Sequence, residues 1–302
     1  MPKKMLFIYN PHAGKAQIRS NLLDIIDTFT VSGYEVTAYP TQGEGDAARA
    51  VLERAGDFEL VVCSGGDGTL DEVVSGMMQR EERIPIGYVP AGSTNDFASS
   101  LRIPSNMKKA ADIVVNGTVR AFDIGSFNGR TFVYVAAFGM PAEVSYETTQ
   151  DMKNLLGHAA YILEGAIHIA DIEPYRIQVE YDDGKIDEPL IFGMISNSLS
   201  VGGIKFFRHR EVFLDDGLFE VILVRAPRTL ADLHAISMAM SQGGDHENVF
   251  IFKASWLKIS SKEPVPWTLD GEKGGVLKNV ELSNLRRGLK MIVPRDEVLP
   301  VR

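Results

Sequence analysis

Six consecutive residues, 64–69, have the composition of a phosphate-binding turn. They read Ser-Gly-Gly-Asp-Gly-Thr and stand between an apolar run and a segment with helical periodicity. Glycine has no Cβ, so its backbone can come close to a phosphate, and the amino end of the following helix offers free N–H groups to an anion. Asp67 would repel a phosphate unless a cation lies between them, which predicts Mg²⁺ at this turn. A capped turn, with Thr69 and Glu72 as a capping box, explains those two residues but not the glycines.

Two further loops could join this turn. Residues 10–15 read Asn-Pro-His-Ala-Gly-Lys and residues 92–96 read Gly-Ser-Thr-Asn-Asp, and each follows an apolar strand-like run. Taken alone, the first is a plain strand-to-helix turn and the second is a helix N-cap. The carboxyl ends of parallel strands lie at one edge of a sheet, where ligands bind. We therefore expect the three loops to converge on one site.

A second candidate group is the acidic pair of Asp270 and Glu272. Transfer of a phosphoryl group to an alcohol needs charge neutralisation, in-line placement and a group that takes the hydroxyl proton. Residues i and i+2 of an extended segment point the same way, so the two carboxylates could share one face and a bridging cation. The alternative is a hairpin turn with exposed acids, which the Asp-Gly pair at 270–271 favours when it is considered alone.

The elements that must position these residues follow two patterns. The first 120 residues alternate strand-like and helix-like segments, which predicts a doubly wound, mostly parallel sheet with helices on both faces. The expected strands are residues 5–9, 34–39, 60–63 and 86–89, and the expected helices are 18–30, 46–55 and 69–79, with a short helix after residue 93.

From about residue 121 onward, strand-like segments dominate. They are residues 122–127, 131–138, 176–181, 190–195, 218–224, 256–260 and 265–269. Asp-Gly pairs at 183–184, 216–217 and 270–271 are typical of hairpin turns, and two helices are expected near 154–170 and 230–241. This half is predicted to be an antiparallel β-sandwich or open barrel.

We therefore expect two domains, residues 1–121 and 122–288, with the active site in the cleft between them. The apolar strand at 289–293 could return to either domain, so residues 289–302 could complete the first one.

Composition and charge exclude several classes of protein. The chain has 302 residues, of which 45% are hydrophobic and 24% charged, as in an ordinary globular protein. No run approaches the ~20 apolar residues of a membrane span, and the apolar run at the amino end is too short for a signal peptide. The net charge of −9 argues against a nucleic-acid partner, and the single cysteine, Cys63, gives no sign of an oxidising compartment. We expect a cytoplasmic protein.

Together these motifs resemble the diacylglycerol kinase catalytic family, which includes soluble bacterial diacylglycerol kinases and, more distantly, sphingosine and ceramide kinases. The resemblance covers nearly the whole chain, because residues 197–203, 214–218 and 269–272 match the second-domain pattern in the right order. The Gly-Gly-Asp-Gly-Thr motif alone is less specific, since NAD kinases and 6-phosphofructokinases share it.

The resemblance implies a role for each matching residue. ATP would be held by Asn10, Pro11, His12, Ala13, Gly14, Thr41, Gly66, Asp67, Gly68, Thr69, Leu70, Asp71, Glu72, Ser93, Asn95 and Asp96. Glu272 would be the general base, and Asp270 would help to hold Mg²⁺ or to orient the acceptor. Asp216, with the backbone carbonyls of Phe213 and Leu218, would bind a second, structural Mg²⁺. Asp71, where the family usually has Asn, and the His12-Ala13 pair, where it usually has a pair ending in Ser, depart from the pattern.

The predicted function is ATP-dependent phosphorylation of a lipid hydroxyl, with diacylglycerol as the leading acceptor and phosphatidic acid, a phospholipid precursor, as the product. The lipid would be met at a membrane surface by transient association, and a homodimer is compatible with the sequence. The apolar helix at 154–170 and the aromatic-basic residues 206–210 could serve this contact or could pack in the core. The alternatives are a sphingoid base, a polyprenol or NAD as the acceptor, or a non-catalytic nucleotide- or lipid-binding protein of the same fold.

Overall fold

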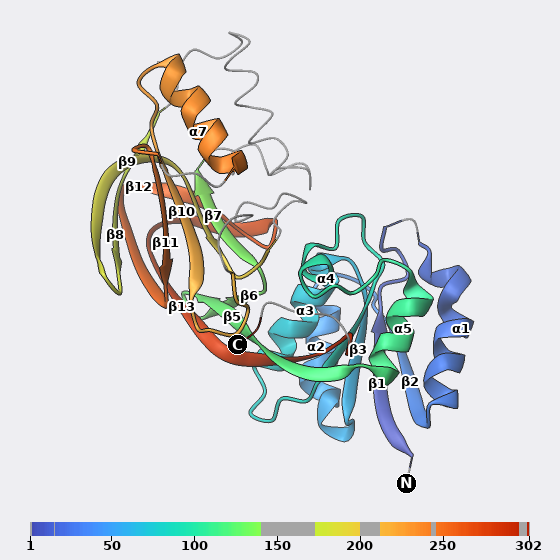
Figure 1. The fold of residues 1–302 in the computed structure, drawn as a ribbon. Helices are drawn as coiled ribbons and strands as arrows, with labels where there is room; N and C mark the ends of the chain where they lie inside the picture. Colours follow the sequence, from blue (N-terminus) through green and yellow to red (C-terminus); the bar gives the residue numbers. More distant parts are fainter. Residues whose placement is uncertain are drawn as a thin grey trace. The chain divides into compact units, whose positions relative to one another are not determined.

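A computed structural model describes residues 2–14, 16–139, 173–199, 212–242, 246–295 and 301 (Figure 1). The chain divides into two compact units. Unit 1 joins Met1–Ile124 with Arg287–Val301, and unit 2 comprises Gly125–Arg286. The helix expected at 154–170 and the residues 206–210 lie outside the described residues.

Unit 1 is built on a parallel sheet. Its strands are β1 (Lys3–Tyr9), β2 (Tyr34–Pro40), β3 (Leu60–Gly65) and β4 (Ile86–Pro90), in the order β4-β3-β1-β2. Every residue of β3 and β4 is buried, as expected for central strands that are covered on both faces. Near the carboxyl end of the chain, Met291 pairs with Ile86 in parallel and extends the sheet beyond β4.

Helices cover both faces of this sheet (Figure 1). On one face, α1 (Ile18–Val31) packs with α5 (Met107–Asn116), and on the other α2 (Asp46–Arg54) packs with α3 (Asp67–Met78). A 3₁₀ turn, η1 (Ala55–Asp57), follows α2, and the short α4 (Asp96–Ser100) follows β4. The doubly wound α/β fold predicted for this half is confirmed, although α5 was not predicted. Its amino end does carry a signal, because the Asn106 side chain accepts a hydrogen bond from the backbone N–H of Lys109.

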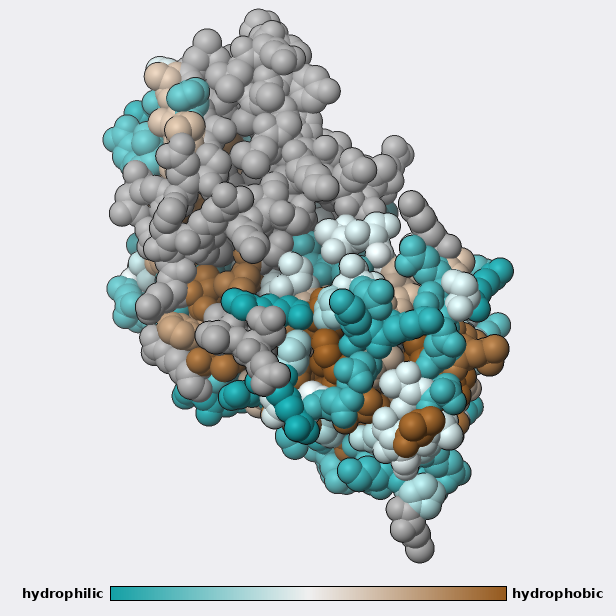
Figure 2. Space-filling view, turned by 45° about the vertical axis from the view of Figure 1, so that its right-hand side comes forward, coloured by the Kyte–Doolittle hydropathy of each residue, from teal (hydrophilic) through white to brown (hydrophobic). Residues whose placement is uncertain are grey.

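On the face seen in Figure 2, unit 1 has teal hydrophilic areas with brown apolar areas among them. Its exposed large hydrophobic side chains are Leu23, Val31, Leu52 and Val119. Single apolar side chains of this kind are normal on the surface of a folded protein and indicate no particular partner. Among the described residues, no helix is both long and apolar enough to cross a membrane.

Unit 2 is an antiparallel, sandwich-like β structure, as predicted. Its strands are β5 (Thr118–Phe127, which begins in unit 1), β6 (Arg130–Phe132), β7 (Val135–Gly139), β8 (Tyr175–Tyr181), β9 (Gly184–Ser196), β10 (Phe219–Arg225), β11 (Val249–Ala254), β12 (Trp256–Leu269) and β13 (Glu272–Val293, which ends in unit 1). The main strand order is β11-β10-β9-β7-β12-β13, and β8 pairs with both β9 and β12. In the sequence, the helix α7 (Leu230–Gln242) follows β10 and precedes β11.

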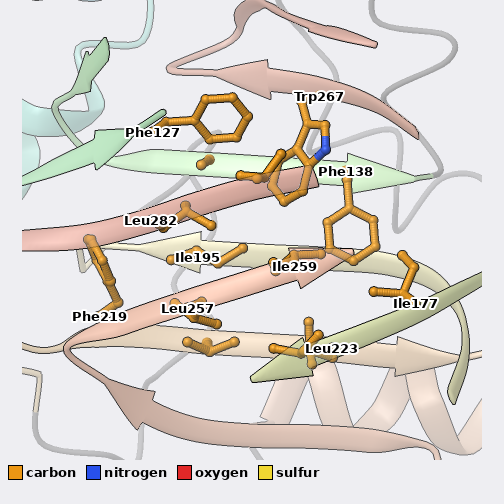
Figure 3. Packing of buried hydrophobic residues seen from close by; sticks show 14 of the residues in the cluster. Phe127, Phe138, Ile177, Ile195, Phe219, Leu223, Leu257, Ile259, Trp267 and Leu282 are labelled. Atoms are coloured by element: carbon orange, nitrogen blue, oxygen red, sulfur yellow. The ribbon is translucent and has the colours of Figure 1, made fainter. Parts of the chain in front are cut away.

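The core of unit 2 is rich in aromatic side chains (Figure 3). The Trp267 ring lies 5.1 Å from that of Phe127 and 4.8 Å from that of Phe138, between ring centroids. Strands β5, β7 and β12 supply these three residues, so the packing joins segments that are far apart in the sequence. Such aromatic pairs stabilise a core by more than their buried area alone.

Three details of unit 2 differ from the sequence prediction. The strands expected at 256–260 and 265–269 form one strand, β12, with a register shift between Ser260 and Val265. The strand expected at 131–138 is interrupted at Val133 and Tyr134, between β6 and β7. The Asp216-Gly217 pair lies in a loop before β10 and is not a hairpin turn.

Candidate active site

The three loops of unit 1 meet, as the strand order predicts. The backbone N–H of Asn10, after β1, donates to the Ser64 carbonyl at 2.9 Å, and its side-chain Nδ2 lies 3.4 Å from Thr69 Oγ1. The N–H of Ala91, after β4, donates to the Gly65 carbonyl at 2.8 Å. The carboxyl end of β3 is therefore hydrogen-bonded to the loops that follow its two neighbouring strands, and the first turn of α3 contacts one of these loops.

Glycine is required where these loops touch. A Cβ added to Gly92 would lie 2.6 Å from Gly66 Cα, a distance that real Cβ atoms do not show. A Cβ on Gly14 would collide with the Ala91 carbonyl oxygen, and Gly14 also has a left-handed φ of +53°. The loops can approach this closely only because these positions have no side chain, which leaves backbone groups to line the site.

The amino end of α3 lies at this loop cluster. Gly66 is its N-cap, so the helix begins at Asp67, two residues earlier than predicted. Thr69 and Glu72 do not form the capping box of the alternative, a plain capped turn. Instead, the Glu72 carboxylate accepts hydrogen bonds from the N–H groups of Gly45 at 2.9 Å and Ala47 at 3.0 Å, and so caps α2. Glu72 therefore joins the amino ends of two helices, and the positive end of the α3 dipole is directed at the loops.

The loop after β2 is fixed beside Asn10. The Thr41 N–H donates to the Tyr9 carbonyl at 2.9 Å, and the Thr41 side chain is largely buried. Asp46 accepts hydrogen bonds from the Gln42 N–H at 2.8 Å and the Tyr39 hydroxyl at 3.0 Å. These donors, the Gln42 N–H first, hold the pKa of the Asp46 carboxyl below its usual value.

The third loop is shaped by Asn95, which has a left-handed φ of +52°. Its side-chain oxygen accepts from the Gly92 N–H and the Tyr88 hydroxyl, and its Nδ2 donates to the Gly92 carbonyl. The carboxamide therefore holds the loop together. A contact between Asn95 and a nucleotide stays a prediction. Ser93 is exposed and Asp96 is buried. Burial also raises the pKa of Tyr88 well above its ordinary value.

The remaining predicted nucleotide residues are Pro11, His12, Ala13, Gly68, Leu70 and Asp71. The first three follow β1, and the His12 N–H donates to Asn10 Oδ1 at 2.9 Å. The other three lie in the first turns of α3, where the Leu70 side chain is buried. Leu70 can therefore contribute only its backbone to a ligand.

In unit 2, Asp270 and Glu272 do not lie together on an extended segment. Asp270 and Gly271 form the two-residue turn between β12 and β13, with φ of +52° and +86°, and Leu269 pairs with Glu272 across it. This is the geometry of a type I′ hairpin. Glu272 is exposed, whereas Asp270 is buried. The expectation that the two carboxylates share one face is therefore wrong.

The Asp270 carboxylate binds backbone instead. It accepts hydrogen bonds from the N–H groups of Val133 at 2.5 Å and of Tyr134 and Val135, both at 2.9 Å. Val133 and Tyr134 interrupt the strand between β6 and β7, and Val135 is the first residue of β7. Asp270 thus ties the turn to the segment 133–135, a contact between residues more than 130 positions apart.

Asp216, expected to hold a structural Mg²⁺ with the carbonyls of Phe213 and Leu218, forms an ion pair with Lys253. Asp216 Oδ1 accepts from the Leu218 N–H at 3.1 Å, and Asp216 Oδ2 lies 3.3 Å from Lys253 Nζ. The same ammonium lies 3.1 Å from Glu220 Oε1 and 5.6 Å from the centre of the Phe213 ring. An ammonium group already supplies the positive charge at Asp216, so this arrangement does not fit a directly bound metal. Burial raises the pKa of Glu220 to about 8.

At the loop cluster, Asp67 is the first residue of α3. Mg²⁺ in phosphoryl-transfer sites usually has one or two carboxylate ligands together with substrate phosphates and waters. A single carboxylate beside backbone-lined loops fits a metal that arrives with a nucleotide. Within the described part of the chain, no group of three or more His, Cys, Asp or Glu residues could hold a metal by itself.

Sequence reasoning missed the buried Glu220 and Asp123 and the half-buried Lys253. Glu220 and Lys253 are directly opposite in the β10–β11 pair, but β11 was not predicted, so their pairing gave no signal. Asp123, in β5, is fully buried and accepts from the Arg287 N–H at 2.7 Å. A lone aspartate in a strand gives no sequence signal for such a distant partner.

Comparisons with known proteins agree with this architecture. Residues 4–127 match the diacylglycerol kinase catalytic domain, and residues 134–292 match the YegS C-terminal NAD kinase beta sandwich-like domain. The chain is 33% identical to a diacylglycerol kinase of Bacillus subtilis (strain 168) over 98% of each chain. It is 35% identical to one of Staphylococcus aureus (strain MRSA252) over 99% of this chain and 95% of the relative.

A solved structure shares the fold. It is described as that of a diacylglycerol kinase from Bacillus anthracis str. Sterne, with a TM-score of 0.78 and 23% identity over 98% of this chain and 99% of that one.

Of the motif at 197–203, residues 200–203 lie outside the described residues.

Proposed function

The chain belongs to the diacylglycerol kinase family and is therefore a lipid kinase, and we propose that it transfers the γ-phosphoryl group of ATP to a hydroxyl of diacylglycerol. The product would be phosphatidic acid. The observation that carries this proposal is the convergence of three glycine-containing loops at the amino end of α3, where no side chain fits between them.

Unit 1 would bind the nucleotide. Backbone N–H groups of the loops after β1, β3 and β4 suit phosphate oxygens, and the α3 dipole favours their negative charge. Asp67 would hold Mg²⁺, which neutralises phosphate charge when it is bound. Thr41 and Ser93 lie on loops at the same ends of the strands and would contact the remainder of the nucleotide.

Unit 2 would supply the base. The Glu272 carboxylate would accept the proton of the lipid hydroxyl while the hydroxyl oxygen forms a bond to the γ-phosphorus. The bond between the γ-phosphorus and the β–γ bridging oxygen breaks at the same time, which releases ADP. Glu272 is exposed and follows directly after the anchored turn, so its backbone direction is set by that turn. The buried Asp270 carboxylate would act through this turn and not as a metal ligand.

A second candidate is an NAD kinase, because residues 134–292 match a domain described as NAD kinase beta sandwich-like. A sphingoid base and a polyprenol are further acceptors for the same chemistry. A lipid acceptor would be met at a membrane surface, so the proposal includes transient association with that surface.

The experiment is an acceptor panel. The protein is incubated with γ-labelled ATP, Mg²⁺ and mixed micelles that contain diacylglycerol, sphingosine or a polyprenol, with NAD in a separate reaction. We expect labelled phosphatidic acid to be the main product. Labelled NADP without a labelled lipid would establish the NAD kinase instead, and no transfer to any acceptor would indicate a non-catalytic protein.

A further inference from the structure

The turn that precedes Glu272 has an unusual backbone. Asp270 adopts a left-handed conformation, which non-glycine residues visit at some energetic cost, and Gly271 follows with φ of +86°. Only these two residues join β12 to β13, so the orientation of the peptide between them sets the direction in which the chain enters Glu272. A group that holds this peptide therefore also holds the proposed base.

Tyr134 is the group that contacts this peptide. Its hydroxyl donates to the backbone carbonyl of Asp270 at 3.1 Å, and its side chain is only 7% exposed. A Cβ placed on Gly271 would lie 4.0 Å from the hydroxyl oxygen, so the phenol lies directly against the turn. The carbonyl that it binds belongs to the central peptide, whose flip distinguishes a type I′ from a type II′ turn.

Tyr134 is itself held in place. Its backbone N–H donates to Asp270 Oδ1 at 2.9 Å, and its carbonyl accepts from the Asn197 N–H at 2.9 Å and from Ser196 Oγ at 3.0 Å. The Asp270 N–H in turn donates to the Val135 carbonyl at 2.8 Å. Backbone and side chain of Tyr134 thus connect the end of β9 with the turn, and the ring has little freedom to move.

We propose that Tyr134 is a positioning residue, whose hydroxyl fixes the central peptide of the β12–β13 turn and so orients Glu272. The Asp270 carboxylate anchors the turn to residues 133–135. The Tyr134 hydroxyl sets the orientation of the peptide between Asp270 and Gly271, because it binds the Asp270 carbonyl. This inference rests on the proposed role of Glu272 as the general base. Misplacing a catalytic group by about 1 Å can lower the rate ~10²-fold, so a modest tilt of this turn has a measurable effect.

The test is Tyr134→Phe, which removes the hydroxyl and keeps the ring. We expect kcat to fall about tenfold, part of the loss that a full misplacement would cause, while KM for ATP and for diacylglycerol stays the same. The control is Tyr181→Phe, a half-buried tyrosine of β8 in the same unit, which should leave kcat unchanged.

Hydrogen exchange separates positioning from stability. In Tyr134→Phe, the amides of a peptide spanning residues 268–276 should exchange faster, whereas those of 257–261 in the core of β12 should not change. The pH dependence of kcat should keep its acid limb, because Glu272 still takes the proton. If kcat falls together with faster exchange at 257–261, Tyr134 has only a structural role and the inference is overturned.

The inference and the proposed function can fail separately. Wild-type kcat in Tyr134→Phe would overturn the positioning role and leave the role of Glu272 intact. Wild-type kcat in Glu272→Gln would overturn both, because no base would remain to be positioned.

Discussion

The two regions proposed for chemistry are held together in different ways. In unit 1, loops touch through backbone, and a Cβ on Gly92 would lie only 2.6 Å from Gly66 Cα. In unit 2, one buried carboxylate, that of Asp270, binds three backbone N–H groups of a distant segment. The first kind of site is sensitive to added atoms, and the second is sensitive to a lost acceptor.

Unit 2 contains an internal reference for this second kind of site. Asp182, in the turn between β8 and β9, accepts from the Ser255 N–H at 2.7 Å, the Ser255 hydroxyl at 2.5 Å and the Trp256 N–H at 3.4 Å. Slight desolvation raises the pKa of the Asp182 carboxyl, but these hydrogen bonds outweigh it and hold the pKa below its ordinary value. Asp182 is exposed and is followed by no proposed base. The turns at Asp182 and Asp270 are therefore fixed by the same kind of hydrogen bonds, but only the turn at Asp270 precedes a residue with a proposed catalytic role.

The largest expected effect is that of Asp270→Asn. An asparagine has one acceptor oxygen and adds an N–H₂ group that would face N–H donors, so hydrogen bonds to a charged group are lost. At ~1.5–3 kcal/mol for each such bond, unfolding should become easier by roughly 3 kcal/mol. The turn should also lose its orientation, so kcat should fall ~10²-fold. Both quantities are measured with the lipid kinase assay and by denaturant unfolding.

Asp182→Asn is the matched variant for Asp270→Asn, because it removes the same kind of carboxylate from the other turn. It should lower the free energy of unfolding by about 1 kcal/mol, as is usual for hydrogen bonds at an exposed turn, and kcat should not change. Equal losses of kcat in the two variants would show that turn stability in general, and not the turn beside Glu272, controls the rate.

Gly92→Ala probes the unit 1 side of the comparison. The added Cβ forces the loops after β3 and β4 apart, so KM for ATP should rise about tenfold or more, since overpacking commonly costs ~1–3 kcal/mol. The matched variant is Gly43→Ala, because a Cβ at Gly43 would meet nothing within 4 Å. An unchanged KM for ATP in Gly92→Ala would contradict the nucleotide site proposed for these loops.

Glu72→Ala should have a smaller effect. Glu72 caps α2 through Gly45 and Ala47, so its loss should lower stability by about 1 kcal/mol, the usual value of a helix cap. Thermal unfolding measures this change. A rise of tenfold or more in KM for ATP with no change in stability would show instead that Glu72 contacts the nucleotide.

The smallest expected effect is a dependence of stability on pH. The pKa of Asp46 lies below its ordinary value of 3.8 in the folded protein, chiefly because the Gln42 N–H donates to it. Its stabilising contribution is therefore complete above pH 3.8 and is lost as the pH falls through the lower folded value, where the unfolded chain binds more protons. Asp46→Asn should have a flatter unfolding profile in this acidic range, measured by the change of Tm with pH. Identical changes of Tm with pH in wild type and Asp46→Asn would exclude a contribution of Asp46 to the pH dependence of stability.

The same contrast explains what could be predicted from the sequence. Glycines and helical periodicity are local signals, so the parallel sheet and the meeting of its loops were predicted. The helix expected from Thr69 begins at Asp67 in the structure. The capping box of Thr69 and Glu72, a local pattern, does not form, because the partners of Glu72 lie 25 and 27 residues away. The partners of Asp270 are still more distant, and no local pattern indicates them. The first part of β13 was missed because its exposed lysines and glycines lack the apolar alternation of a strand.

The most direct test is a single-turnover measurement of labelled phosphoryl transfer from ATP to diacylglycerol in Glu272→Gln. Glu281→Gln, an exposed change in the same strand, is the control. We expect a rate ~10²-fold or more below wild type in Glu272→Gln with ATP binding unchanged, as for the loss of a general base, and a wild-type rate in the control. Transfer at the wild-type rate in Glu272→Gln would show that Glu272 is not the general base.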